Sequence, residues 1–269
     1  MKNVYLGIIA LLVVAFGVSW AFPDSRELMV KSLFKAPDND EIPLPKKKAN
    51  AKAEVPLPKG RQTGASDNKP GKPGTAEVDT TSKNILFIGD SMLEGLKPRL
   101  AAYAEENGHK LNAVIWYSST SEIWGRNGAV KVREYIKKFK PDYIFISLGG
   151  NELFVKEIKD RRKKYVEAIL HEFGNIPYVW IGPPNWKPDT GINDLLAETC
   201  AEGSFYLSYT PDQHYDRTSD GAHPTRSSAA LWMDRICQWV MTQSAHPIKL
   251  NKPSKQNGSC HTEMLQPST

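Results

Sequence analysis

The sequence predicts an α/β fold in which helices cover both faces of a parallel sheet. Short apolar runs alternate with segments of helical spacing across residues 83–244. The apolar runs are 84–89, 111–116, 142–149, 177–182 and 204–209. The helical segments lie near 92–107, 127–139, 158–173, 190–201 and 225–243. Parallel strands need crossover helices, and strands buried on both faces read as nearly continuous apolar runs, so this order favours a parallel sheet.

An apolar segment at the start of the chain predicts contact with a membrane. Residues 3–23, "NVYLGIIALLVVAFGVSWAFP", carry no charge and approach the length of a bilayer span, about 20 residues. We expect residues 1–23 to be an uncleaved anchor, because the run is longer than the apolar part of most signal peptides. "SWA" at 19–21 also resembles a signal-peptide cleavage site, so release of the remainder is the alternative. In both cases the domain is exported, and an anchored chain would hold it on the periplasmic side.

The segments that flank residues 83–244 lack the pattern of a folded domain. Residues 24–82 are rich in Pro, Lys and Gly and nearly free of aromatic residues, which predicts a disordered tether. Residues 245–269 are polar and predict a tail. The sequence therefore predicts one catalytic domain on a long linker.

Composition argues against several classes of partner and cofactor. The formal net charge of the 269 residues is +5, and no stretch interleaves basic and aromatic residues, so we expect no nucleic-acid partner. The three cysteines have no metal-ligand spacing, and we expect neither a metal nor another cofactor. Cys200 and Cys237 are either a disulfide pair or buried free thiols.

Polar residues that follow the predicted strands are the candidates for chemistry, because ligands of open parallel sheets bind beyond the carboxyl ends of the strands. Gly89-Asp90-Ser91 follows the first strand and leads into a helix. Ser91 there could be a nucleophile whose own backbone N–H donates to an oxyanion. The competing interpretation is an ordinary helix-capping serine.

A base and a second oxyanion donor follow later strands. His223 is the best candidate base among six histidines, because Asp220 three residues earlier can orient its ring. His214 in "PDQHYD" is its competitor. Asn151 follows two glycines and could donate its amide to an oxyanion, although a turn-forming Gly-Asn is the alternative.

Three of these segments resemble the sequence blocks of one enzyme family. "GDS" at 89–91, "GGNE" at 149–152 and "DGAH" at 220–223 resemble, in order, the first, third and fifth blocks of the SGNH (GDSL-like) hydrolases. The resemblance implies a three-layer α/β/α sandwich with a five-stranded, flavodoxin-like parallel sheet, and ester hydrolysis or acyl transfer through a serine acyl-enzyme. It implies that Ser91 is the nucleophile, His223 the base, Asp220 its orienting acid and Asn151 an oxyanion donor.

The sequence departs from the family pattern at two places. The second block usually supplies a glycine whose N–H joins the oxyanion hole, but "YSSTSEIWG" has none there. Ser119 is the best candidate for that position, and Ser121 is the alternative. Glu152 stands where the family commonly has Asp, and we expect this acid to support the loop. We interpret Asp90 as a structural turn residue.

These observations predict an exported serine esterase that removes O-acetyl groups from a cell-envelope or other polysaccharide. Asn185, Trp186 and Trp124 follow strands and could contact a sugar ring, or could be lid or core residues. One alternative is an O-acetyltransferase fed by a membrane acyl donor. Another is a non-catalytic glycan-binding domain on the same fold.

Overall fold

A six-stranded parallel sheet forms the centre of the structure, a computed structural model that describes residues 76–265. The strands are β1 (Asn84–Gly89), β2 (Lys110–Trp116), β3 (Tyr143–Ser147), β4 (Tyr178–Ile181), β5 (Phe205–Tyr206) and β6 (His261–Leu265). Their order across the sheet is β5-β4-β3-β1-β2-β6, and every neighbouring pair is parallel. The first five coincide with the predicted apolar runs, so the α/β fold class is confirmed.

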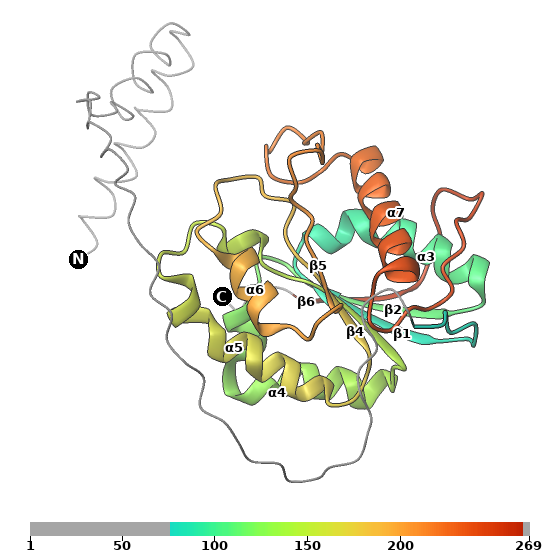
Figure 1. Cartoon of the computed structure of the whole chain (residues 1–269), viewed down its shortest axis with the longest axis horizontal. Coiled ribbons are helices and arrows are strands. Elements are labelled where there is room, and N and C mark those ends of the chain that lie inside the picture. The colour runs from blue at the N-terminus through green and yellow to red at the C-terminus, as the bar shows by residue number, and fades with distance from the viewer. Residues whose placement is uncertain (1–75, 266–269) are drawn as a thin grey trace, which may run out of the picture. The chain divides into compact units, whose positions relative to one another are not determined.

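Helices cover both faces of the sheet and make a three-layer sandwich (Figure 1). One layer contains α3 (Met92–Asn107) and α7 (Arg226–Thr242). The opposite layer contains α4 (Ser121–Phe139), α5 (Ile158–Phe173) and α6 (Ile192–Thr199). Each layer packs its own apolar cluster against the sheet. Because β1 lies under both layers, Ile85, Leu86, Phe87 and Ile88 are all 0% exposed, which explains the unbroken apolar run.

Helix α4 begins earlier than the sequence predicts and contains a break. The periodic segment near 127–139 is its second part, while the first part starts at Ser121. Asn127, Gly128 and Ala129 have φ values of 56°, 67° and 56°, in the left-handed region, where the chain changes direction between the two parts. Because the break interrupts the helical period, the sequence pattern indicates only the second part.

The prediction of five strands is wrong, because β6 adds a sixth. It lies in the segment expected to be a polar tail, and it pairs with β2 so that Trp116 is opposite Leu265. β6 is an edge strand whose side chains are half-buried or exposed, so its composition, "HTEML", gives no apolar run. Ile248 and Leu250, in the same expected tail, are each 2% exposed and pack under α3 and α7.

Two further expectations concern cysteines and the membrane. Cys200 and Cys237 are free thiols, each buried in the cluster on a different face of the sheet, so the disulfide alternative is wrong. Residues 1–23 and most of the predicted tether lie outside the described residues. Among residues 76–265, none of the helices has the length and apolar character needed to cross a bilayer.

Candidate active site

The site lies where the chain order reverses across the sheet. From β1 the chain proceeds to β2 on one side, and β3 then returns to pair with the other side of β1. The crevice beyond the carboxyl ends of such strands is the usual ligand site of an open parallel sheet. Ser91 follows β1 and Asn151 follows β3, so both residues stand at this crevice.

Ser91, His223 and Asp220 form one hydrogen-bonded chain. The Oγ of Ser91 lies 2.8 Å from Nε2 of His223. On the other side of the ring, Nδ1 lies 2.6 Å from Oδ2 of Asp220. Although Ser91 occupies the N-cap position of α3, its side chain makes no capping hydrogen bond. The hydroxyl is therefore held by the imidazole, and the structure brings together the three residues singled out in the sequence.

A tight turn holds Asp220 ready to orient the ring. Its Oδ1 accepts the N–H groups of Ala222 and His223, at 2.8 and 3.0 Å, and the hydroxyl of Thr218 at 2.8 Å. The hydrogen bonds from the backbone N–H and the ring of His223, then those from Ala222 and Thr218, lower the pKa of the Asp220 carboxyl well below its usual range. Asp220 is therefore ionised whenever the ring needs an acceptor for its Nδ1–H.

His214, the competing base, lies apart from this chain. Its side chain is 90% exposed, and its Nε2 lies 3.5 Å from Oδ1 of Asp216. His223 is therefore the histidine that the fold brings to Ser91.

Arg217 is a site residue that the sequence reasoning missed. Its guanidinium donates to the carbonyl of Ala222 at 2.7 Å, inside the Asp220–His223 turn. It also donates to the carbonyl of Pro184, and more weakly, at 3.4 Å, to that of Asn185, both in the loop after β4. A short antiparallel bridge between Arg217 and Pro224 closes the same turn. A lone arginine in a loop carries no motif, so only the fold reveals this clamp.

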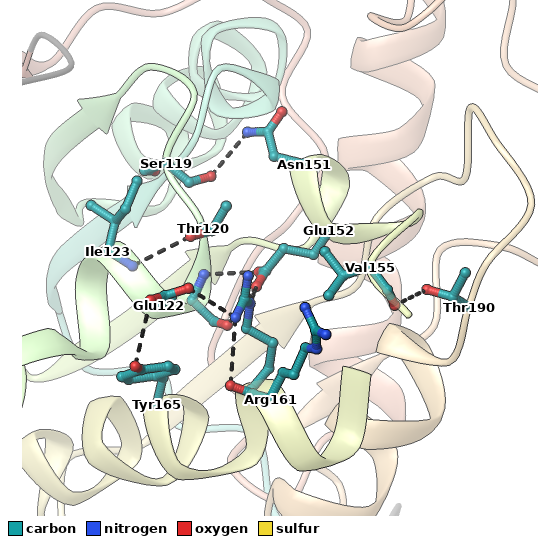
Figure 2. Close-up of polar contacts among 12 residues, drawn as sticks. Ser119, Thr120, Glu122, Ile123, Asn151, Glu152, Val155, Arg161, Tyr165 and Thr190 are labelled. Atoms are coloured by element: carbon teal, nitrogen blue, oxygen red, sulfur yellow. Dashed lines mark hydrogen bonds and ion pairs between the residues drawn. The ribbon is translucent and has the colours of Figure 1, made fainter. Parts of the chain in front are cut away.

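Two donors are available for an oxyanion beside Ser91. Within residues 76–265, the backbone N–H of Ser91 has no acceptor. Asn151 donates one amide hydrogen to the carbonyl of Ser119 at 2.9 Å, as Figure 2 shows, which leaves its second amide hydrogen for a ligand. Asn151 thus lies after β3, at the same end of the sheet as Ser91.

The third expected donor is not available in this structure. The N–H of Ser119 donates to the carbonyl of Trp116 at 3.2 Å, and the Ser119 side chain is buried, where its Oγ accepts from the indole of Trp124. The alternative, Ser121, donates its N–H to Oε2 of Glu152 at 2.8 Å. In this structure, therefore, each of the two N–H groups considered for the missing glycine already has an acceptor inside the protein.

Glu152 connects the loops after β2 and β3. It is 0% exposed and accepts hydrogen bonds from both the backbone N–H and the hydroxyl of Ser121. It also forms an ion pair with Nε of Arg162 on α5 at 2.8 Å. Arg162 also pairs with Glu122, at 2.8 Å. Figure 2 shows Glu152 and Glu122 within one network of polar contacts. Burial raises the pKa of the Glu152 carboxyl, although the hydrogen bonds from Ser121 and the charge of Arg162 oppose the rise.

Asp90 is a buried acid directly before the nucleophile. Its Oδ1 accepts the N–H of Met92 at 2.9 Å, which is the turn role expected from the sequence. Its Oδ2 has no partner among the described residues and faces Gly150. Burial raises the pKa of Asp90 to about 7, the charge of Glu152 adds to the rise, and the N–H of Met92 and the charge of His223 oppose it.

The three residues considered for sugar contact divide into two groups. Trp124 lies on the buried face of α4 and is 0% exposed, so its assignment to a sugar-binding surface is wrong. Trp186 and Asn185 are half-buried and line a cleft of about 950 Å³. The Trp186 indole donates to the carbonyl of Gly150 at 2.9 Å, next to Asn151. Among residues 76–265, no three His, Cys, Asp or Glu side chains gather as a metal site would require.

Comparison with known proteins gives structural likenesses only. No family model and no curated protein matches the sequence. The chain is similar in fold to the psychrotrophic esterase EstA from Pseudoalteromonas sp., with 14% identity, a TM-score of 0.42, and coverage of 58% of this chain and 96% of that chain. An acetyl esterase variant with an acetate ion has 14% identity and a TM-score of 0.41, with 57% and 96% covered. A lipolytic protein of the G-D-S-L family from Desulfitobacterium hafniense has 13% identity and a TM-score of 0.38, with 58% and 98% covered.

Proposed function

We propose that this protein is a serine esterase of the SGNH type that works through an acyl-enzyme. The observation that carries the proposal is the continuous chain from Ser91 Oγ to His223 Nε2 at 2.8 Å, and from His223 Nδ1 to Asp220 Oδ2 at 2.6 Å. A nucleophile, a base and an acid that orients the base are the parts that acyl transfer requires.

The geometry supports a two-step reaction. Asp220 accepts the Nδ1–H, so the Nε2 lone pair faces the Ser91 hydroxyl and takes its proton as Oγ bonds to the ester carbonyl carbon. The carbonyl oxygen becomes an oxyanion, which the Ser91 N–H and the second Asn151 amide hydrogen stabilise. His223 then returns the proton to the leaving alcohol as the C–O bond breaks. Water repeats the sequence on the acyl-enzyme, releasing the acid and restoring Ser91.

We further propose that the ester is an O-acetyl group on a cell-envelope or other polysaccharide. The apolar segment 3–23 and the long Pro/Lys-rich tether support an anchored domain on the outer side of the membrane, within reach of such polymers. The aromatic and amide groups of Trp186 and Asn185 in the cleft beside the site support a sugar as the alcohol part.

The test compares the full-length protein with Ser91→Ala, using 4-nitrophenyl acetate and a serine-directed phosphonate. We expect Ser91→Ala to lose at least 10³-fold in kcat/KM and all labelling, because the nucleophile is gone. Ser227→Ala, an exposed serine in the first turn of α7, is the matched control and keeps both. Equal, negligible turnover by the parent and Ser91→Ala would instead indicate a non-catalytic glycan-binding domain. Transfer of acetyl to an added oligosaccharide faster than release of acetate would identify an acetyltransferase.

A further inference from the structure

We infer that the cleft lined by Asn185, Trp186 and Tyr209 binds the sugar carrying the ester, and that Trp186 and Arg217 couple its occupation to the catalytic groups. This inference rests on the proposed function. It adds a positioning role for two residues and assigns the alcohol part of the substrate, rather than its acyl part, to the cleft.

The cleft is built by three segments at the β4–β5 side of the sheet. Its wall comes from the loop after β4, the start of α6 and the chain after β5. Tyr209 and Leu207 supply exposed surface there, 54% and 42% exposed respectively. Asn185 and Trp186 lie on the loop after β4, and Asp189 lies beside them.

The chemistry of this lining suits a pyranose ring. Aromatic faces pack against the C–H face of a sugar, while amide and carboxylate groups bond its hydroxyls. Both oxygens of Asp189 are occupied by α6, where they accept N–H groups of Gly191, Ile192 and Asn193. The Oδ1 of Asn185 accepts the amide of Asn193 at 3.0 Å, so the Asn185 amide N–H groups and the rings of Trp186 and Tyr209 are left to meet a ligand. The ammonium of Lys187, an exposed residue, lies 4.6 Å from the centroid of the Trp186 ring. A sugar packed on that face of the ring would take the place of the ammonium.

Trp186 links the cleft to the oxyanion side of the site. Its ring lies in the cleft wall, and its indole N–H donates to the carbonyl of Gly150 at 2.9 Å. Gly150 immediately precedes Asn151 and faces the buried carboxyl of Asp90, which adjoins Ser91. A ligand that fixes the Trp186 ring therefore also fixes the backbone that carries the Asn151 donor.

Arg217 links the same loop to the base. Its guanidinium spans the carbonyls of Pro184 and Asn185 on the cleft side and that of Ala222 on the His223 side. Burial lowers the pKa of Arg217, and within the described residues it forms no ion pair with a carboxylate. The Arg217 guanidinium therefore joins the backbone of the loop after β4 to the backbone of the turn that carries His223. A ligand that orders this loop also orders that turn.

The first experiment measures binding without chemistry, so that its result is independent of the esterase proposal. Full-length Ser91→Ala is titrated with xylotetraose, cellotetraose and chitotetraose, and tryptophan fluorescence and calorimetry report binding. We expect at least one of the three to bind, and we expect Tyr209→Ala in the same background to weaken it at least fivefold. Leu231→Ala, 46% exposed on α7 and outside the cleft, is the control and should bind as the parent does. No binding of any of the three sugars at 20 mM, or equal binding by Tyr209→Ala, overturns the assignment.

The second experiment tests the coupling through kinetics. Trp186→Phe keeps an aromatic ring in the cleft wall and removes the donor to Gly150, so we expect kcat on acetylated xylotetraose to fall about tenfold while KM changes less than twofold. Arg217→Lys should lower kcat in the same way, because an ammonium cannot span the three carbonyls. If Trp186→Phe raises KM and leaves kcat at the parent value, the ring only binds sugar and the coupling is refuted. If the parent itself shows no turnover of acetylated xylotetraose, the proposed function is refuted, while the binding result still stands.

Discussion

The buried acid beside the nucleophile should make the stability of this protein depend on pH, and Asp90→Asn should remove that dependence. Asp90 is 1% exposed, its Oδ2 has no partner among the described residues, and its pKa is raised to about 7. The side chain is therefore neutral in the folded protein below pH 7, whereas in the unfolded chain it ionises near its ordinary value of 3.8.

The sign and size follow from this difference in proton binding. Between the two pKa values the folded state holds a proton that the unfolded state has lost, so the contribution of Asp90 to the free energy of unfolding falls as pH rises. The slope is about 1.4 kcal/mol per pH unit between the two pKa values and halves at pH 7, so the contribution falls by about 2.3 kcal/mol from pH 5 to pH 7 and by about 2.6 kcal/mol from pH 5 to pH 8. Asn keeps the acceptor for the Met92 N–H and cannot ionise, so the variant should lack this slope.

Urea unfolding of the full-length protein at pH 5, 6, 7 and 8 measures the effect. The stabilities of the parent and Asp90→Asn should diverge in favour of the variant by about 2.6 kcal/mol from pH 5 to pH 8. Asp160→Asn, in the exposed first turn of α5, is the matched control and should follow the parent. Parallel stability curves for Asp90→Asn and the parent, within about 0.5 kcal/mol at every pH, would refute the reasoning from a buried, unpartnered carboxyl.

Three further substitutions test residues that hold the site in place. Gly89→Ala should destabilise by about 2 kcal/mol in thermal unfolding, because its Cβ would lie 2.3 Å from a backbone oxygen of β3; a neutral effect would mean that the two strands separate easily. Glu152→Gln should lower the free energy of unfolding in urea by about 2–3 kcal/mol, since it removes the negative charge that faces the Arg162 guanidinium. A variant as stable as the parent would show that this ion pair is dispensable. Arg217→Lys should lower kcat on 4-nitrophenyl acetate about tenfold with a change in Tm of less than about 3 °C, and unchanged turnover would show that the turn holding His223 needs no clamp.

The sequence predicts the parts of the fold that are buried on both faces and misses those at its edge. β1, α3 and α5 occur at the residues expected, because apolar runs and helical periods follow directly from burial. β6 was missed because an edge strand can be polar on both faces. The start of α4 was missed because its break interrupts the helical period.

The same division holds for the candidate site. Ser91, Asp220 and His223 could be inferred because each follows a strand in a short, specific pattern, and the structure brings them together. The backbone donor expected from the loop after β2 could not be inferred in this way. A backbone N–H is available to a ligand only if no group of the protein accepts it, and the N–H groups of Ser119 and Ser121 both have acceptors. Contacts of this kind depend on loop conformation, which single-residue patterns do not encode.

The sixth strand also bears on how the domain can be synthesised. β2 can bury its outer edge only when residues 261–265 have been made, and within residues 76–265 these come after all the other strands and helices. Until then β2 presents unpaired backbone groups, the kind of edge on which chains aggregate. The pairing is long-range and therefore slow to form. The N–H of Tyr117, in the loop that leads to Ser119, donates to the carbonyl of Leu265 at 3.3 Å. A nascent chain therefore gains this hydrogen bond to the loop after β2 only once β6 has been made.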